Sequence, residues 1–133
     1  LPVRNIEENK NVSMFTTVRD CVPAGIFSGK LVVTMRPMQP APAVRAVQVT
    51  TRFHLTHGAP IHMGAPGVLG IRDLQAPDYG DAVTIRKDEI PVFWACGVTA
   101  LNAVTAPALP LVITHAPGHM FVSDLRDAHL AVL

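Results

Sequence analysis

The chain has 133 residues, enough for one domain that buries roughly two-thirds of the surface exposed by the unfolded chain. Its formal charge is +1, 16% of its residues are charged, and it has one Trp and one Tyr, so nucleic acid is not expected as a partner. Hydrophobic residues make up 49% of the chain, yet no apolar run approaches the ~20 residues of a membrane span, which excludes a membrane partner as well.

The start of the chain and its cysteines bear on where the protein works. No basic stretch followed by an apolar one marks a secretory signal, and Cys21 and Cys96 are too few for a disulfide framework. We therefore expect the cytoplasm, with the mitochondrial matrix as the alternative. The first residue is Leu1 rather than Met, which suits a fragment or a processed chain, and the high apolar fraction suits a half-protein whose partner covers one face.

Twelve prolines and nine glycines divide the chain into short elements. Apolar and β-branched runs predict strands at 30–36, 82–86, 90–95, 109–114 and 120–123. Helices are predicted at 42–53 and 98–105, with turns at 61–71 and 77–81. This alternation predicts a single domain over residues 1–133 with an α/β fold, built on a mixed sheet with short helices and long Gly/Pro-rich loops. A two-layer α+β sandwich is the alternative.

Three loops concentrate the reactive side chains. They are His57-Gly-Ala-Pro-Ile-His62, Phe93-Trp-Ala-Cys-Gly97 and Thr114-His-Ala-Pro-Gly-His-Met120, where Gly and Pro fix the backbone beside each reactive group. In open α/β sheets, ligands bind beyond the carboxyl ends of the strands. Arg36, Cys96 and the 115–119 loop each follow a predicted strand, so the sequence predicts that they share one site.

The histidines and the cysteine are candidates for proton transfer. His115 and His119 are the first choice, because imidazole exchanges protons near neutral pH; alternatively, they hydrogen-bond only their own loop. A His-x-x-x-His pair on a helix, completed by His57 or His62, would bind a metal, but Pro and Gly inside the spacer argue against a helix, and no metal is expected. Cys96 would act as nucleophile or base, or would serve only as a small buried hydrophobe.

Charged side chains supply the remaining candidates. Arg36 and Arg52 suit bidentate binding of carboxylates; alternatively, each is an ordinary surface Arg or pairs with Asp78 or Asp81. These two aspartates are predicted either to supply a general acid or to serve only the turn at 77–81.

Six segments carry a family resemblance: Val32-Val-Thr-Met-Arg-Pro37, Thr51-Arg-Phe53, His57-Gly-Ala-Pro-Ile-His62, Pro77-Asp-Tyr-Gly-Asp81, Pro91-Val-Phe-Trp-Ala-Cys-Gly-Val-Thr99 and Thr114-His-Ala-Pro-Gly-His-Met120. With them the chain resembles the second half of members of the D-glutamate cyclase family, also described as hydro-lyases. The first half, with a Cys-Ser-Phe-Ser-Phe-type string, is absent here. Ala65 stands where we expect Asp, and Ala100 and Leu101 stand where we expect Pro-Gln.

The resemblance implies a cofactor-free lyase that converts D-glutamate to 5-oxo-D-proline, the α-amine attacking the side-chain carboxyl carbon while water leaves. Its partner would be a small acidic amino acid, together with either further copies of the chain or the missing N-terminal half. The residues expected to bind the substrate are Arg36, Arg52, His57, His62, Gly97 and Thr99. The alternatives are a truncated, non-catalytic module that binds small acids, and a metal-dependent hydrolase that uses the histidines.

Overall fold

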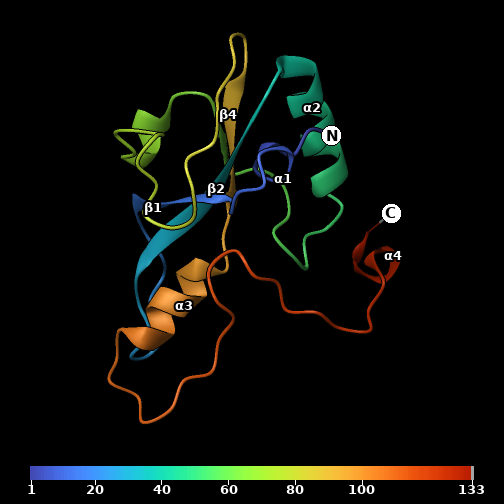
Figure 1. Cartoon of the computed structure of the whole chain (residues 1–133). Helices are drawn as coiled ribbons and strands as arrows, with labels where there is room; N and C mark the ends of the chain where they lie inside the picture. The colour runs from blue at the N-terminus through green and yellow to red at the C-terminus, as the bar shows by residue number, and fades with distance from the viewer. Residues whose placement is uncertain (133) are drawn as a thin grey trace.

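The centre of the fold is an antiparallel sheet in the order β1-β2-β4-β3, and the computed structural model describes residues 1–132. Its strands are β1 (Ser13–Asp20), β2 (Lys30–Met38), β3 (His62–Met63) and β4 (Ile90–Ala95). Short helices surround it, as Figure 1 shows: α1 (Arg4–Glu7), α2 (Pro40–Thr50), the 3-10 helix η1 (Pro66–Leu69), α3 (Val98–Thr105) and α4 (Asp127–Leu130). No helix within this described range has the length and apolar character needed to cross a membrane.

The mixed content of helices and strands is confirmed, but the mixed sheet is wrong, because all three strand pairings are antiparallel. The predicted strands at 30–36 and 90–95 and the helices at 42–53 and 98–105 are present as β2, β4, α2 and α3. The predicted strand at 30–36 ends before Pro37, whereas β2 continues through Pro37 to Met38. Pro37 lies opposite Pro91, a position where neither residue has an N–H to donate.

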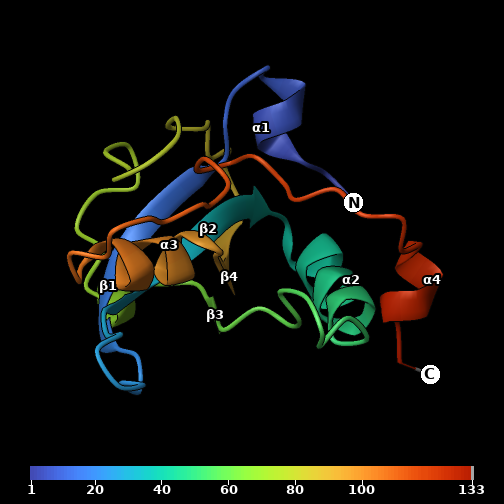
Figure 2. The same cartoon turned by 90° about the horizontal axis from the view of Figure 1, so that it is seen from below.

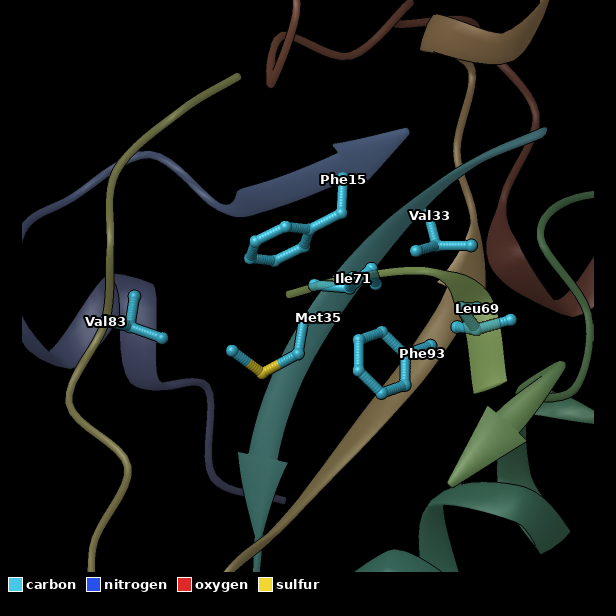
Figure 3. Packing of buried hydrophobic residues seen from close by; sticks show 7 residues of the cluster. All are labelled: Phe15, Val33, Met35, Leu69, Ile71, Val83 and Phe93. Atoms are coloured by element: carbon cyan, nitrogen blue, oxygen red, sulfur yellow. The ribbon is translucent and has the colours of Figure 1, made fainter. Parts of the chain in front are cut away.

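One face of the sheet forms the larger core. Side chains alternate between the two faces of a strand, so every second residue of β1, β2 and β4 points to this side. Here the sheet is covered by the irregular segment 66–85 rather than by a long helix. Figure 3 shows the packed side chains, which are Phe15, Val33, Met35, Leu69, Ile71, Val83 and Phe93.

The other face carries α2 and α3 near opposite ends of β4, as Figures 1 and 2 show. Helix α2 begins at Pro40, a residue suited to the first helical position, and packs Ala43 and Ala46 against Met38, Val92 and Trp94. Helix α3 packs through Val98, which contacts the buried Met14 and Val32. Helices on one face of an antiparallel sheet are typical of the α+β class.

Three predicted strands are wrong. Segment 82–86 buries Val83 in the core as an extended strand would, but it pairs with no strand of residues 1–132. Its backbone bonds to side chains instead: the N–H of Thr84 donates to Glu8, and the carbonyl of Ala82 accepts from Lys10. Segments 109–114 and 120–123 are irregular and largely exposed. Helix α1 and strand β1 lie before residue 30, where no element was predicted.

A buried ion pair fixes the N-terminus to the loop before β4. The side chain of Arg4 is only 2% exposed; its guanidinium donates to both carboxylate oxygens of Glu89 and to the carbonyl of Thr84, 2.7 Å away. Burial raises the pKa of Glu89, but the hydrogen bonds from Arg4 and from the backbone N–H of Arg86, with their charges, outweigh it, so the pKa lies below its usual range. Removing one partner of such a pair leaves an uncompensated buried charge.

We expect Glu89→Gln to reduce the free energy of unfolding by about 3 kcal/mol near neutral pH, because the buried Arg4 then keeps only the part-exposed Glu7, 3.1 Å from its Nε, as an anionic partner. The pKa of Glu89 is depressed in the folded state, so its contribution is present above the unfolded pKa of about 4.3 and is lost as pH falls through the lower folded value. Urea unfolding across this acid range measures both effects. Asp88→Asn, at an exposed neighbour, is the control; equal stability of Glu89→Gln and wild type would contradict the prediction.

Candidate functional site

Arg36 lies on the sheet face that carries α2 and α3, and it lines a hollow of about 240 Å³. The walls come from β2, β4, the end of α2 and the loop that follows α2. The lining residues are Thr34, Arg36, Thr50, Phe53, Thr56, His57, Gly58 and Trp94. Such a hollow is slightly smaller than the ~300 Å³ at the lower end for drug-sized ligands, a size that suits an amino acid.

The guanidinium of Arg36 has an aromatic neighbour but no anion. Its Cζ lies 5.5 Å from the centroid of the Trp94 ring, within the range of a cation–π contact. Its Nε is buried and finds no hydrogen-bond partner among residues 1–132. None of the ion pairs formed within residues 1–132 includes Arg36, so the predicted alternative of a pair with Asp78 or Asp81 is wrong. A partly buried cation with an unused donor is suited to receive a ligand carboxylate.

Burial changes the acidity of Arg36 and of its neighbour Cys96. Burial lowers the pKa of the Arg36 guanidinium, while the nearby Cys96 raises it. Burial also raises the pKa of the Cys96 thiol, against opposing contributions from the backbone N–H of Val98 and the charge of Arg36. Burial thus favours the neutral thiol of Cys96 over the thiolate. Both side chains project from the same face of the sheet, since Cys96 continues the alternation of Val92 and Trp94 beside the strand of Arg36.

Gly97 and His115 line a second, mainly apolar hollow of about 400 Å³ between α3 and segment 109–115. A Cβ added to Gly97 would lie 2.8 Å from Nε2 of His115, so this exposed imidazole rests against the glycine and would have to move for any larger residue. The Nδ1–H of His115 donates to the carbonyl of Ala116 at 2.8 Å. His115 therefore lies beside the residue that follows Cys96, but it does not line the hollow of Arg36.

The remaining predicted residues are distributed over the molecule. His119 is exposed and donates from Nδ1 to the carbonyl of Pro117. His62 stacks on Phe93, on the opposite face of the sheet from Arg36, and donates to the carbonyl of Ala65. Arg52 is exposed and donates to the carbonyl of Val132, and Thr99 joins α3 to both backbone groups of Val32.

Asp78 and Asp81 bind backbone groups of the first strand region. Oδ2 of Asp78 accepts from the N–H of Thr16 at 2.7 Å, and Oδ2 of Asp81 accepts from the N–H of Asn11 at 2.8 Å. Both contacts hold the turn at 77–81 against β1, the structural role that the sequence analysis set beside general-acid catalysis.

The structure thus places Arg36 and His57 on the walls of one hollow and His115 in the neighbouring hollow. Cys96 lies on the same sheet face as Arg36 and packs against the cluster of Met14, Val32 and Val98, outside the lining of either hollow. The predicted convergence at the carboxyl ends of the strands is wrong, because β2 and β4 are antiparallel and end at opposite edges. Arg36 and Cys96 approach each other because they share a face of the sheet. Thr34 and Trp94 line the hollow although neither was predicted as a site residue; the alternation of Thr34 and Arg36 along β2 was the signal for Thr34.

Metal binding has no ready site in this arrangement. Among the residues that the structure describes, no three His, Cys, Asp or Glu side chains are grouped so that they could hold one ion.

The turn at 77–81 generates a stability prediction. Gly80 has φ +72°, and a Cβ there would overlap the carbonyl oxygen of Val12, whereas Gly64, with φ +95°, has open space around it. Gly64→Ala should cost about 1–2 kcal/mol of unfolding free energy from backbone strain alone. Gly80→Ala should cost clearly more, because the clash adds to a similar strain. Urea unfolding measures the free energy of unfolding of both variants. Equal losses would show that the turn does not pack closely against Val12, the residue before β1.

The closeness of Arg36 and Cys96 generates a second prediction. In a Cys21→Ser background, Arg36→Met should raise the pKa of Cys96, because the charge that lowers it is lost. Arg36→Lys retains the charge and should preserve most of the wild-type value. The pH dependence of iodoacetamide alkylation measures this pKa. Arg52→Met is the matched control, and the same pKa in Arg36→Met and wild type would contradict the arrangement.

Comparison with known proteins gives a consistent family assignment. The family model described as D-glutamate cyclase matches residues 1–124. The protein of Bacillus subtilis (strain 168) named "Putative hydro-lyase YcsI" is 60% identical over 134 residues, covering 100% of this chain and 52% of the relative. A protein of Syntrophobacter fumaroxidans named "Putative hydro-lyase" is 59% identical over 133 residues, covering 100% of this chain and 51% of the relative.

A third relative, from Bradyrhizobium sp. (strain ORS 278), is named "Putative hydro-lyase BRADO2538" and is 56% identical over 133 residues, covering 100% of this chain and 49% of the relative. The chain thus spans about half the length of the curated relatives it matches. Because the family model covers nearly the whole chain, the chain belongs to the D-glutamate cyclase family.

Proposed function

We propose that this chain supplies the carboxylate-binding side of a hydro-lyase site that closes D-glutamate into 5-oxo-D-proline with loss of water. Family membership supports the reaction class, and the half-buried guanidinium of Arg36, which pairs with no anion within residues 1–132, supports an acidic substrate. The single observation on which the proposal depends is that this cation faces a hollow of amino-acid size.

The hollow offers different chemistry on its different walls. Arg36 can hold one carboxylate through charge-assisted hydrogen bonds. Phe53 and Trp94 present apolar surface that would exclude water from the methylene groups of the substrate and favour a folded conformer. Because amine and carboxyl already belong to one molecule, holding that conformer supplies much of what the cyclisation requires.

Proton transfer has one candidate on the wall of this hollow and a second on the same face of the sheet. The reaction takes one proton from the ammonium group before attack and a second from nitrogen after the N–C bond forms. Both protons are delivered to one side-chain carboxyl oxygen, which leaves as water when its C–O bond breaks. His57 lines the hollow with an exposed imidazole, and we assign to it the exchange of these protons. The Cys96 thiol, close to Arg36, is the second candidate donor for the departing oxygen.

A second candidate function is binding of small acids without catalysis. It is favoured by the separation of the predicted catalytic groups: His115 lies in the other hollow, and Asp78 and Asp81 hold backbone groups of the first strand region. Under this alternative, D-glutamate would bind at Arg36 without turnover.

The test is to incubate the chain, and separately the full-length Bacillus subtilis relative, with D-glutamate and to detect 5-oxoproline by mass spectrometry, with calorimetry for binding. Arg36→Met should weaken the binding of D-glutamate about 10- to 100-fold, because charge-assisted hydrogen bonds are lost. Arg52→Met, at an exposed position, should leave it within about twofold.

The outcomes separate the two functions. Product formation that depends on Arg36 supports the lyase, and binding without product in both proteins supports the binding module. If neither protein binds or converts D-glutamate, or if Arg52→Met impairs binding as much as Arg36→Met, the assignment of this hollow is wrong.

A further inference from the structure

Two stretches near the C-terminus, 109–114 and 120–123, have the sequence of strands but not their structure. We call them together the apolar strip. Its large side chains face solvent: Ile113 is 87% exposed, Phe121 86% and Val122 83%. Figure 1 shows the strip within the long irregular trace, orange to red, that leads from α3 to α4.

The charge pattern of this region is unusual for a surface. From Ile90 to Ser123 the chain contains no Asp, Glu, Lys or Arg, and charge returns only at Asp124. Strand-like segments that stay in water are normally protected by charged residues, above all Lys. The centre of a protein interface has the opposite composition, depleted in charge and enriched in aromatic residues and Met. The strip, with Met120 and Phe121, has the composition of an interface centre.

The backbone of the strip is equally available. Within residues 1–132 no strand pairs with either stretch, so most of their N–H and C=O groups can form a ladder with an added strand. The exceptions are the N–H of Leu109, which donates to the carbonyl of Pro107, and Pro110, which has no N–H. Beneath the first stretch lies the apolar hollow of about 400 Å³, lined on one side by Leu101 and Val104 of α3. A side chain from a covering partner, or a closer approach of the first stretch, would fill this space.

We propose that the apolar strip is the docking edge for the remaining half of the family polypeptide, which adds backbone pairing at 109–114 and 120–123. The curated relatives align with all of this chain at 56–60% identity and carry about as much chain again. In those proteins the strip is covalently connected to the remaining half of the polypeptide, which is therefore present at an effective concentration in the millimolar range. A second copy of the chain would have to compete with that connected partner.

Backbone hydrogen exchange tests the proposal. The amides of the two stretches are followed in this chain and in the full-length Bacillus subtilis relative. We expect the aligned amides to exchange at least about 100-fold more slowly in the full-length relative, because a ladder of hydrogen bonds protects them. Fast exchange in both proteins would overturn the proposal. Concentration-dependent protection in this chain alone would also overturn it, by identifying a second copy as the occupant.

Substitutions give an independent readout. Ile113→Lys should leave the Tm of this chain unchanged, since the side chain is already in water, whereas the aligned substitution should lower the Tm of the full-length relative by several degrees. Val44→Lys on the exposed side of α2 is the matched control and should have little effect in either protein. An unchanged Tm for the aligned Ile113 variant in the full-length relative would contradict docking at the strip.

Discussion

The candidate site depends on the antiparallel register between β2 and β4. Because Arg36 lies opposite Val92 and Thr34 opposite Trp94, the long side chain of Arg36 reaches along the sheet and rests near the indole ring. The same register orients Cys96 to this face, beyond Trp94. A shift of one residue would turn Arg36 into the core on the other face, where Met35 and Phe93 now pack. The pairing of the sheet and the position of Arg36 in the candidate site therefore depend on the same register.

The hollow around Arg36 exists because the helices cover only part of the sheet. Helix α2 packs near one end of β4 and α3 near the other, each through small or branched side chains. The loop after α2 brings Phe53 and His57 over the part of the sheet that the helices leave uncovered. Burial there lowers the pKa of Arg36 without neutralising it, since guanidinium stays charged in proteins. The fold thus keeps a cation in a partly dry environment, where its attraction for a carboxylate is stronger than in water.

The local patterns predicted β2, β4 and α3 well, because their apolar runs bury side chains in the way their sequences indicate. The patterns failed where a segment has the apolar residues of a strand but does not pair with one. Val83 enters the core from a segment that pairs with no described strand, and 109–114 has a strand pattern but no partner within the described residues. The residue types of the site, Arg36 above all, were predictable from their chemistry. Their grouping was not, because it depends on strand direction, and periodicity does not distinguish parallel from antiparallel strands. The role of Trp94 beside Arg36 needed the register as well.

The most direct test of the account is a crystal structure of the chain, or of the full-length Bacillus subtilis relative, with D-glutamate bound. We expect a substrate carboxylate within hydrogen-bonding distance of Nε or a terminal nitrogen of Arg36, with the methylene groups of the substrate against Trp94 and Phe53. Clear density for D-glutamate at Arg52 or in the hollow beneath α3, with the guanidinium of Arg36 free of any carboxylate, would contradict it.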